Sequence, residues 1–250
     1  ILNNISDLKY YIIGAGSNLL IRDKGYNGII FKFGKHFNKI VLNDNSLDVG
    51  AGILDLNLSK FALINSIKNF EFYTGIPGTV GGAIKMNAGC YGDETANILN
   101  SATIIKSNGK KSIITKDNLK LFYRSSILKD EDIVIAANYI LEYGDKKNIE
   151  EKMVKIKSTR EHTQPLRSKT SGSSFKNPKG NYAAKLIDNA GCKGLNNGDA
   201  YVSTKHSNFL INTHNATATQ IESLGEKIIE LVFKKFQIKL EWEIKILGEK

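Results

Sequence analysis

The sequence has only two cysteines and no long apolar run, and these absences narrow the classes of protein it can represent. Cys90 and Cys192 lie far apart without CxxC spacing, which argues against a disulfide framework and fits a reducing compartment. No apolar run approaches the ~20 residues that a membrane-spanning helix needs. The chain also opens without the charged and apolar segments of a secretory signal. We therefore expect a cytoplasmic protein without a membrane partner.

Two kinds of site are also missing from the sequence. The glycine-rich segments lack the Gly-Lys-Ser/Thr of a P-loop, which argues against triphosphate hydrolysis. The histidines have no metal-ligand spacing with one another, with cysteine or with acidic clusters, so no metal site is expected. They are His36, His162, His206 and His214.

The net charge is +10, from 35 basic and 25 acidic residues. A basic surface can bind nucleic acid by releasing counterions from phosphates. Here the lysines are spread along the chain, without an arginine-rich arm or an aromatic–basic motif, so we expect no nucleic-acid partner. Such a surface would also attract small polyanions such as nucleotide diphosphates.

Hydrophobic periodicity predicts a mixture of strands and helices, which is typical of an α+β protein. Strands are expected at 10–13, 28–31, 39–42, 102–106, 133–141, 201–203 and 209–211, and helices at 54–67, 150–160 and 182–190. The 150–160 helix would carry acidic residues in its first turn and turn Ile149, Met153 and Ile156 inward.

The last part of the chain has two clear local signals. Thr217 and Gln220 form a capping-box pattern that opens a helix. Its inward residues would be Ile221, Leu224, Ile228 and Leu231. Residues 240–247 alternate strictly between apolar and polar, which predicts a strand with one buried face.

The first candidate for chemistry is residues 14–20, Gly-Ala-Gly-Ser-Asn-Leu-Leu, directly after a predicted strand. Glycines there let the backbone approach a ligand and aim its N–H groups at an anion. The third glycine of a Rossmann fingerprint and its later acidic residue are missing. Taken alone, the segment is equally compatible with a plain tight turn.

A second glycine-rich stretch covers residues 75–92, with six glycines and one proline. Such a stretch cannot build a packed core of its own, and its backbone amides suit a diphosphate. The alternative is a flexible surface loop, but several of its side chains favour burial. These are Val80, Ala83, Ile84 and Met86.

Together these segments resemble one family, the UDP-N-acetylenolpyruvoylglucosamine reductases or MurB family. The matching blocks are residues 14–20, 75–92, Tyr123-Arg124, 172–178 (Gly-Ser-Ser-Phe-Lys-Asn-Pro), 186–212 and 243–248. They cover nearly the whole chain in order.

The resemblance implies a fold and a division into domains. The expected fold is α+β, a vanillyl-alcohol-oxidase-type FAD-binding fold in two lobes with a smaller α+β substrate domain. The FAD-binding domain would span 1–150, with lobes 1–61 and 62–150, and the polar segment 163–174 would cross between domains. The substrate-binding domain would span 158–236, and a C-terminal strand, 237–250, would return to the FAD lobes.

The resemblance also implies an activity. NADPH would reduce FAD, whose N5 would pass a hydride to C3 of the enolpyruvyl group of UDP-N-acetylglucosamine enolpyruvate, giving UDP-N-acetylmuramate for peptidoglycan synthesis. Ser173 would protonate C2, and Arg124 and Glu243 would stabilise the enol-like intermediate. The cofactor residues would be Gly14, Ala15, Gly16, Ser17, Asn18, Leu19, Gly75, Pro77, Gly78, Thr79, Gly81, Gly82, Asn87, Ala88 and Gly89; the substrate residues would be Tyr123, Asn177, Tyr182 and Lys245.

The chemistry of these side chains agrees with such roles. Hydride addition at C3 leaves negative charge on C2 and the carboxylate, which a guanidinium such as that of Arg124 can meet with paired hydrogen bonds. Glu243 lies on the polar face of its predicted strand, opposite Trp242. Outside the family context, each would be an ordinary surface residue.

The chain also departs from the family pattern. Thr163 stands where the family often has a lysine, two residues before the proline of the crossing segment, so one phosphate contact is in doubt. The short interval from Arg124 to Pro165 resembles the compact class that lacks the substrate-covering tyrosine loop. The opening strand and Lys-Ile-Gly-Gly motif of the family are absent before Tyr10.

Three rival functions stay open at this point. A flavin oxidase or dehydrogenase with another substrate would show no NADPH-driven turnover. A flavin- or nucleotide-binding module without catalysis would show no rapid flavin reduction. A nucleic-acid binder would show steeply salt-dependent DNA binding.

Overall fold

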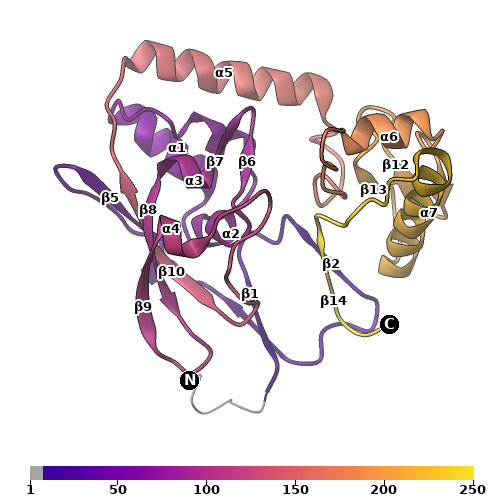
Figure 1. Ribbon diagram of the computed structural model, residues 1–250, viewed down its shortest axis with the longest axis horizontal. Helices are drawn as coiled ribbons and strands as arrows, with labels where there is room; N and C mark the ends of the chain where they lie inside the picture. Colours follow the sequence, from indigo (N-terminus) through magenta and orange to yellow (C-terminus); the bar gives the residue numbers. More distant parts are fainter. Residues whose placement is uncertain (1–7) are drawn as a thin grey trace. The chain divides into compact units, whose positions relative to one another are not determined.

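The computed structural model describes residues 8–250. The opening segment, on which the expectation of a missing secretory signal depends, lies outside the described residues. The chain forms two compact units (Figure 1). Of the described residues, the first unit contains those up to Ala15 together with Gly28–Thr159; the second contains Gly16–Asn27 and Arg160–Lys250.

The first unit is organised by a five-stranded antiparallel sheet in the order β4-β5-β10-β8-β9. Its strands are β4 (Ile40–Leu42), β5 (Ser46–Gly50), β8 (Leu99–Ile105), β9 (Lys111–Thr115) and β10 (Ile133–Ile140). The apolar β10 lies at the centre, which fits its expected burial. The sheet takes strands from both sides of the lobe boundary predicted at residue 61.

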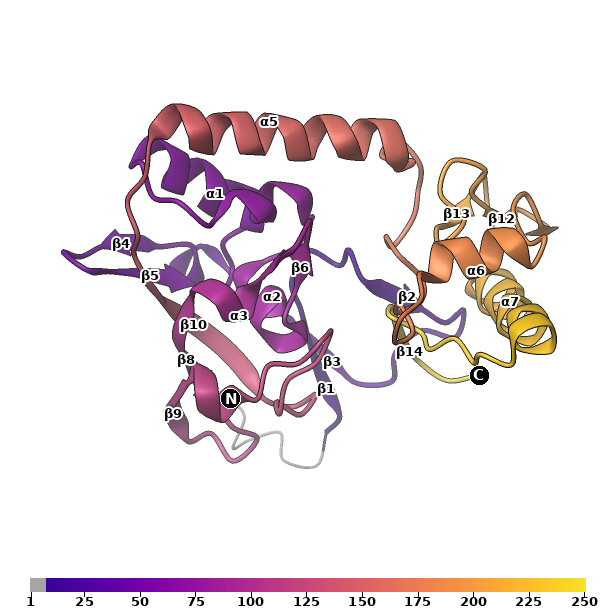
Figure 2. The same ribbon diagram turned by 45° about the horizontal axis from the view of Figure 1, so that its top comes forward.

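Short elements surround this sheet. A parallel pair joins β1 (Tyr10–Ile13) to β3 (Ile29–Lys32), and a small hairpin joins β6 (Gly89–Cys90) to β7 (Asp93–Glu94). The helical elements are η2 (Lys35–Phe37), α1 (Asp55–Ile64), η3 (Glu71–Gly75), α2 (Val80–Met86), α3 (Thr95–Ile98), α4 (Lys116–Leu119) and α5 (Lys146–Thr163). The first part of α5 runs alongside α1, as Figure 2 shows.

Helix α5 confirms one prediction and corrects another. Ile149 and Met153 are buried, as the periodicity predicts. The helix begins at Lys146, four residues earlier than expected, so its first turn contains no acidic residue. Asp145, just before the helix, accepts a hydrogen bond from the Asn148 N–H and stabilises the earlier start.

The second unit packs two helices, α6 (Ala183–Asn189) and α7 (Ala218–Phe236), with a three-stranded sheet. The strands are β11 (Asn196–Asn197), β12 (Ala200–Val202) and β13 (Leu210–Asn212). The capping box is confirmed: the Thr217 hydroxyl accepts from the Gln220 N–H, and the Gln220 side chain accepts from the Thr217 N–H. Leu224 and Ile228 are buried as predicted, and Val232 joins them.

The short segment Gly16–Asn27 belongs to the second unit although it lies early in the chain. Its strand β2 (Leu19–Ile21) pairs in parallel with β14 (Lys245–Leu247). Asp23 accepts from the Ala218 and Thr219 N–H groups at the start of α7, and hydrogen bonding to Thr219 lowers the pKa of Asp23. Hydrogen bonds to backbone and side chain thus fix this segment to the C-terminal part of the chain.

The terminal segment keeps the predicted alternation but forms a shorter strand, since only Lys245–Leu247 is regular. Leu240 and Ile244 are buried, whereas Glu241 and Lys245 are exposed. No helix within residues 8–250 combines the length and apolar character needed to cross a membrane.

Candidate functional site

The Gly-Ser-Ser-Phe-Lys-Asn-Pro motif lies between two other segments of the second unit. Ser173 pairs with Phe209 in an antiparallel bridge, and the Ser174 N–H donates to the Asn208 carbonyl at 2.8 Å. On its other side the Ser174 carbonyl accepts from the Glu243 N–H at 2.8 Å. The structure therefore brings the segments of Ser173 and Glu243 together.

Asn208 is a positioning residue that the sequence analysis did not single out. Asn208 is 4% exposed. Its side chain forms hydrogen bonds with the backbone of Phe175, as a neighbouring strand would. The amide oxygen accepts from the Phe175 N–H at 3.0 Å, and the amide nitrogen donates to the Phe175 carbonyl at 2.8 Å. A buried asparagine satisfied in this way fixes the backbone two residues after Ser173. In the sequence, the only indication of its importance was its position inside the block 186–212 that matches the family.

Asn18, from the first glycine-rich segment, holds the backbone around Glu243. Its side-chain nitrogen donates to the Glu243 carbonyl at 3.1 Å, and its own carbonyl accepts from the Lys245 N–H at 2.9 Å. Glu243 is half-buried, and the alternation of this segment turns Ile244 to the opposite, buried side. The segment therefore presents Glu243 and Lys245 on one face.

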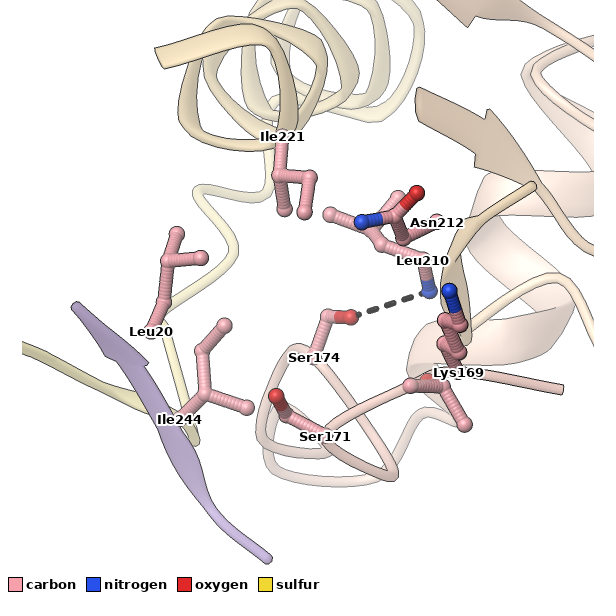
Figure 3. Close-up of a pocket in the computed structure, with 9 residues that line it drawn as sticks. Leu20, Lys169, Ser171, Ser174, Leu210, Asn212, Ile221 and Ile244 are labelled. Carbon is pink, nitrogen blue, oxygen red and sulfur yellow. Dashed lines mark hydrogen bonds between the residues drawn. The ribbon is translucent and has the colours of Figure 1, made fainter. Parts of the chain in front are cut away.

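Behind this strand the second unit contains a pocket of about 230 Å³ (Figure 3). It is lined by Leu20, Lys169, Thr170, Ser171, Ser174, Leu210, Asn212, Ile221 and Ile244. The Ser174 hydroxyl accepts from the Leu210 N–H at 3.3 Å in this pocket. Ser174 is therefore a buried packing residue, and Ser173 does not line the pocket.

Arg124 lies in the first unit, at the tip of a tight turn. The Phe122 N–H donates to the Ser125 carbonyl at 3.0 Å, and the Ser125 N–H donates to the Phe122 carbonyl at 3.1 Å. Arg124 has a φ of 53°, a left-handed conformation that costs a non-glycine residue ~1–2 kcal/mol. Such strain concentrates at functional sites. The guanidinium carbon lies 4.9 Å from the centre of the Tyr123 ring.

Gly14, which opens the first glycine-rich segment, lies against the second segment within the first unit. A Cβ atom on Gly14 would lie 2.3 Å from the Thr79 hydroxyl oxygen, and one on Gly81 would lie 3.1 Å from the Ala51 Cβ. A side chain at Gly14 would therefore displace the Thr79 hydroxyl, and one at Gly81 would need a small shift of Ala51. Val80, Ala83 and Ile84 are buried in α2, so the second stretch is a folded element and not a flexible loop.

Asp55 faces this region as a buried carboxyl group. It is 0% exposed, and a Cβ atom on Gly78 would lie 2.5 Å from its Oδ2. Neither carboxyl oxygen has a hydrogen-bond partner among the described residues. Burial raises the pKa of Asp55 well above its usual range.

Asp55→Asn should flatten the pH dependence of stability. Folded Asp55 keeps a proton that the unfolded chain loses above about pH 4, so the wild-type protein loses stability as pH rises toward the folded-state pKa. Asparagine does not titrate, so the Tm of the variant relative to wild type should rise between pH 4 and pH 8. Calorimetry across this range measures the difference, with exposed Asp44→Asn as control. Parallel curves for wild type and Asp55→Asn would contradict the assignment.

The predicted substrate residues occupy distinct places. Asn177 accepts from the Ala183 N–H at 2.9 Å, at the start of α6. Tyr182 is 71% exposed and lines a second pocket, together with Asn181, Lys185, Leu186, Asn189, Phe236 and Ile238. Lys245 lies on β14, and Thr163 is the last residue of α5. Among the described residues, no group of three His, Cys, Asp or Glu side chains could hold a metal ion.

Comparison with known proteins places this geometry in a family. The family described as UDP-N-acetylenolpyruvoylglucosamine reductase, C-terminal domain, matches residues 164–247, and an FAD binding domain family matches residues 2–113. The UDP-N-acetylenolpyruvoylglucosamine reductase of Orientia tsutsugamushi (strain Ikeda) is 45% identical over 249 residues, covering 98% of this chain and 82% of that protein. The reductase of Caulobacter vibrioides is 44% identical over 239 residues, covering 94% and 79%.

A solved structure agrees in sequence and in fold. The crystal structure of UDP-N-acetylenolpyruvylglucosamine reductase (MurB) from Thermus caldophilus superimposes with a TM-score of 0.87 at 33% identity, covering 99% of this chain and 88% of that one. Both expectations from sequence, an α+β FAD-binding fold and the family itself, are confirmed. The chain belongs to the UDP-N-acetylenolpyruvoylglucosamine reductase family.

Proposed function

We propose that this chain reduces the enolpyruvyl group of UDP-N-acetylglucosamine enolpyruvate to give UDP-N-acetylmuramate. NADPH is the reductant, FAD is the cofactor, and the product is a precursor of peptidoglycan. The observation that carries the proposal is 45% identity to a reductase of this name across 98% of the chain. We place the reaction in the cytoplasm, which agrees with two cysteines that are both thiols.

The glycine-rich region of the first unit fits an anionic dinucleotide such as FAD. At Gly14 and Gly78 a Cβ atom would collide with Thr79 or Asp55, so neither position has room for a side chain toward these neighbours. Burial raises the pKa of Asp55, which disfavours a negative charge that would repel a diphosphate. Gly14, Gly78 and Thr79 are the residues we expect to hold FAD in this unit.

Bound FAD supplies the hydride that C3 of the enolpyruvyl group receives. The protein residues have three tasks in this proposal. Arg124 binds the substrate carboxylate with a planar, two-pronged hydrogen bond, and Tyr123 packs beside its guanidinium. Ser173 donates a proton to C2, and Glu243 helps to stabilise the enol-like intermediate. Asn177, Tyr182 and Lys245 bind the remainder of the UDP-sugar.

The direct test combines colour, stoichiometry and product. The purified protein should be yellow and should release all its flavin on acid precipitation. One NADPH should be consumed per enolpyruvyl substrate, with a product heavier by two hydrogens in mass spectrometry. UDP-N-acetylglucosamine, which lacks the enolpyruvyl group, should not reoxidise the reduced flavin. Reoxidation by oxygen alone would instead favour a flavin oxidase.

Arg124→Lys should lower kcat/KM by roughly 10- to 150-fold while FAD stays bound. Lysine keeps the charge but loses the planar fork, and one lost charge-assisted hydrogen bond is worth about 1.5–3 kcal/mol. Steady-state kinetics with varied enolpyruvyl substrate measure the effect, and the flavin absorbance per protein checks occupancy. Wild-type kinetics in this variant would remove Arg124 from the site.

A further inference from the structure

Three side-chain hydrogen bonds tie the Arg124 turn to the C-terminal end of α2 and to Gly89, which follows it in β6. The Ser126 hydroxyl donates to the Lys85 carbonyl at 2.6 Å. The Asn87 side chain donates to the Phe122 carbonyl at 3.1 Å. The Arg124 guanidinium donates to the Gly89 carbonyl at 2.7 Å. We call these three bonds the α2 clamp.

Asn87 is the buried centre of the α2 clamp. It is 0% exposed, and it ends α2 in a left-handed conformation with a φ of 45°. Its amide oxygen accepts from the Ala96 N–H at 3.0 Å, while its amide nitrogen reaches Phe122. Both ends of the side chain are therefore satisfied inside the protein, which fixes the orientation of the amide.

We propose that Asn87 is a positioning residue for Arg124. This differs from the contact with FAD that the family resemblance implied for Asn87. Phe122 begins the two-residue turn that carries Arg124, so fixing its carbonyl fixes where the strained turn places the guanidinium. The inference rests on the proposed function, in which Arg124 binds the substrate carboxylate. It adds that the second glycine-rich segment orients the catalytic arginine as well as approaching the cofactor.

Asn87→Asp tests the proposal with minimal change of shape. The aspartate oxygen can still accept from the Ala96 N–H, but the donor to Phe122 becomes an oxygen facing an oxygen. Stopped-flow measurement should show near-normal flavin reduction by NADPH. Reoxidation by the enolpyruvyl substrate should slow by ~10- to 100-fold, the scale expected when a catalytic group is misplaced by about 1 Å. Equal slowing of both half-reactions would overturn the proposal.

A double-mutant cycle separates positioning from a general structural effect. In an Arg124→Ala background, Asn87→Asp should slow reoxidation by less than about threefold, because its effect acts through the missing arginine. An undiminished effect in that background would overturn the proposal. Exposed Asn57→Asp, in the same unit, controls for the added charge. Ser126→Ala, which removes the neighbouring bond of the α2 clamp, should produce a smaller loss of the same kind.

Thermal unfolding gives a readout that does not depend on turnover. If the α2 clamp holds the turn, the Tm shifts of Asn87→Asp and Ser126→Ala should be non-additive, since both loosen one turn. Additive shifts would count against the clamp even in an active enzyme. A different result would separate the two proposals. If the Tm shifts of the variants are non-additive but the wild-type protein binds flavin and never reacts with the enolpyruvyl sugar, the proposed function is refuted and the α2 clamp still stands.

Discussion

Ser173→Ala is expected to slow flavin reoxidation by the enolpyruvyl substrate by ~10²–10⁴-fold, the usual contribution of a positioned acid. A serine hydroxyl is a weak acid, so it can protonate only a strongly basic centre such as the carbon left beside C3 after hydride addition. The serine is not needed earlier, and flavin reduction by NADPH should stay near normal. Stopped-flow absorbance of the two half-reactions measures both rates.

Ser174→Ala provides the matched control, because the two serines are adjacent but differ in environment. Ser174 is 2% exposed, and its hydroxyl accepts from the Leu210 N–H. Its loss should cost about 1 kcal/mol of stability and little rate. A larger kinetic defect in Ser174→Ala than in Ser173→Ala would mean that the acid has been assigned to the wrong residue. The same conclusion would follow if Ser173→Ala slowed both half-reactions equally.

Gly225→Ala should destabilise the second unit, although alanine is ordinarily the better helix residue. A Cβ atom at Gly225 in α7 would lie 1.9 Å from the Trp242 ring. The ring cannot retreat easily, since it stacks on Phe175 at 4.7 Å and its N–H donates to Glu226 at 2.9 Å. Overpacking of this kind costs ~1–3 kcal/mol or more, which corresponds to a Tm lower by roughly 2–12 °C.

The same substitution should also reduce activity, because Trp242 directly precedes Glu243. Exposed Ser223→Ala in the same helix controls for helix propensity and should leave the Tm within about 2 °C of wild type. A smaller ring should relieve the collision, so Gly225→Ala with Trp242→Phe should recover part of the lost Tm. Calorimetry on the three variants and the wild-type protein measures these shifts, and a Gly225→Ala variant as stable as wild type would contradict the packing described.

Local signals predicted much of the fold. The Thr217–Gln220 capping box and the alternation of residues 240–247 depend on neighbours in sequence; the capping box is confirmed, and the alternation is confirmed in part, with a strand only at Lys245–Leu247. Helix α2 was not predicted, because Gly81 and Gly82 each disfavour a helix by about 1 kcal/mol. The helix forms because tertiary packing buries its apolar residues, and no local pattern reports that packing.

The candidate site also contains residues that the sequence predicted and residues that it did not. Family motifs located Ser173, Arg124 and Glu243, and their assigned roles remain predictions. The partners that fix their backbones were not predictable from spacing. Asn208 and Asn87 resemble ordinary loop asparagines in the sequence, and Asp55 resembles an acidic residue at a helix start. Their burial becomes evident only when segments distant in the chain are brought together.

The placement of Gly16–Asn27 in the second unit has a consequence for folding during synthesis. The hydrogen bond from Ala218 to Asp23 spans 195 residues, and the bond from Arg22 to Glu222 spans 200. At the usual 5–20 residues per second, these partners emerge from the ribosome about 10–40 s apart. During that interval β2 has an unpaired edge and Leu20 has none of its α7 or β14 neighbours, a state that exposes a nascent chain to misassembly. The first unit can assemble its central sheet by Ile140, whereas the second must wait for Arg160–Lys250.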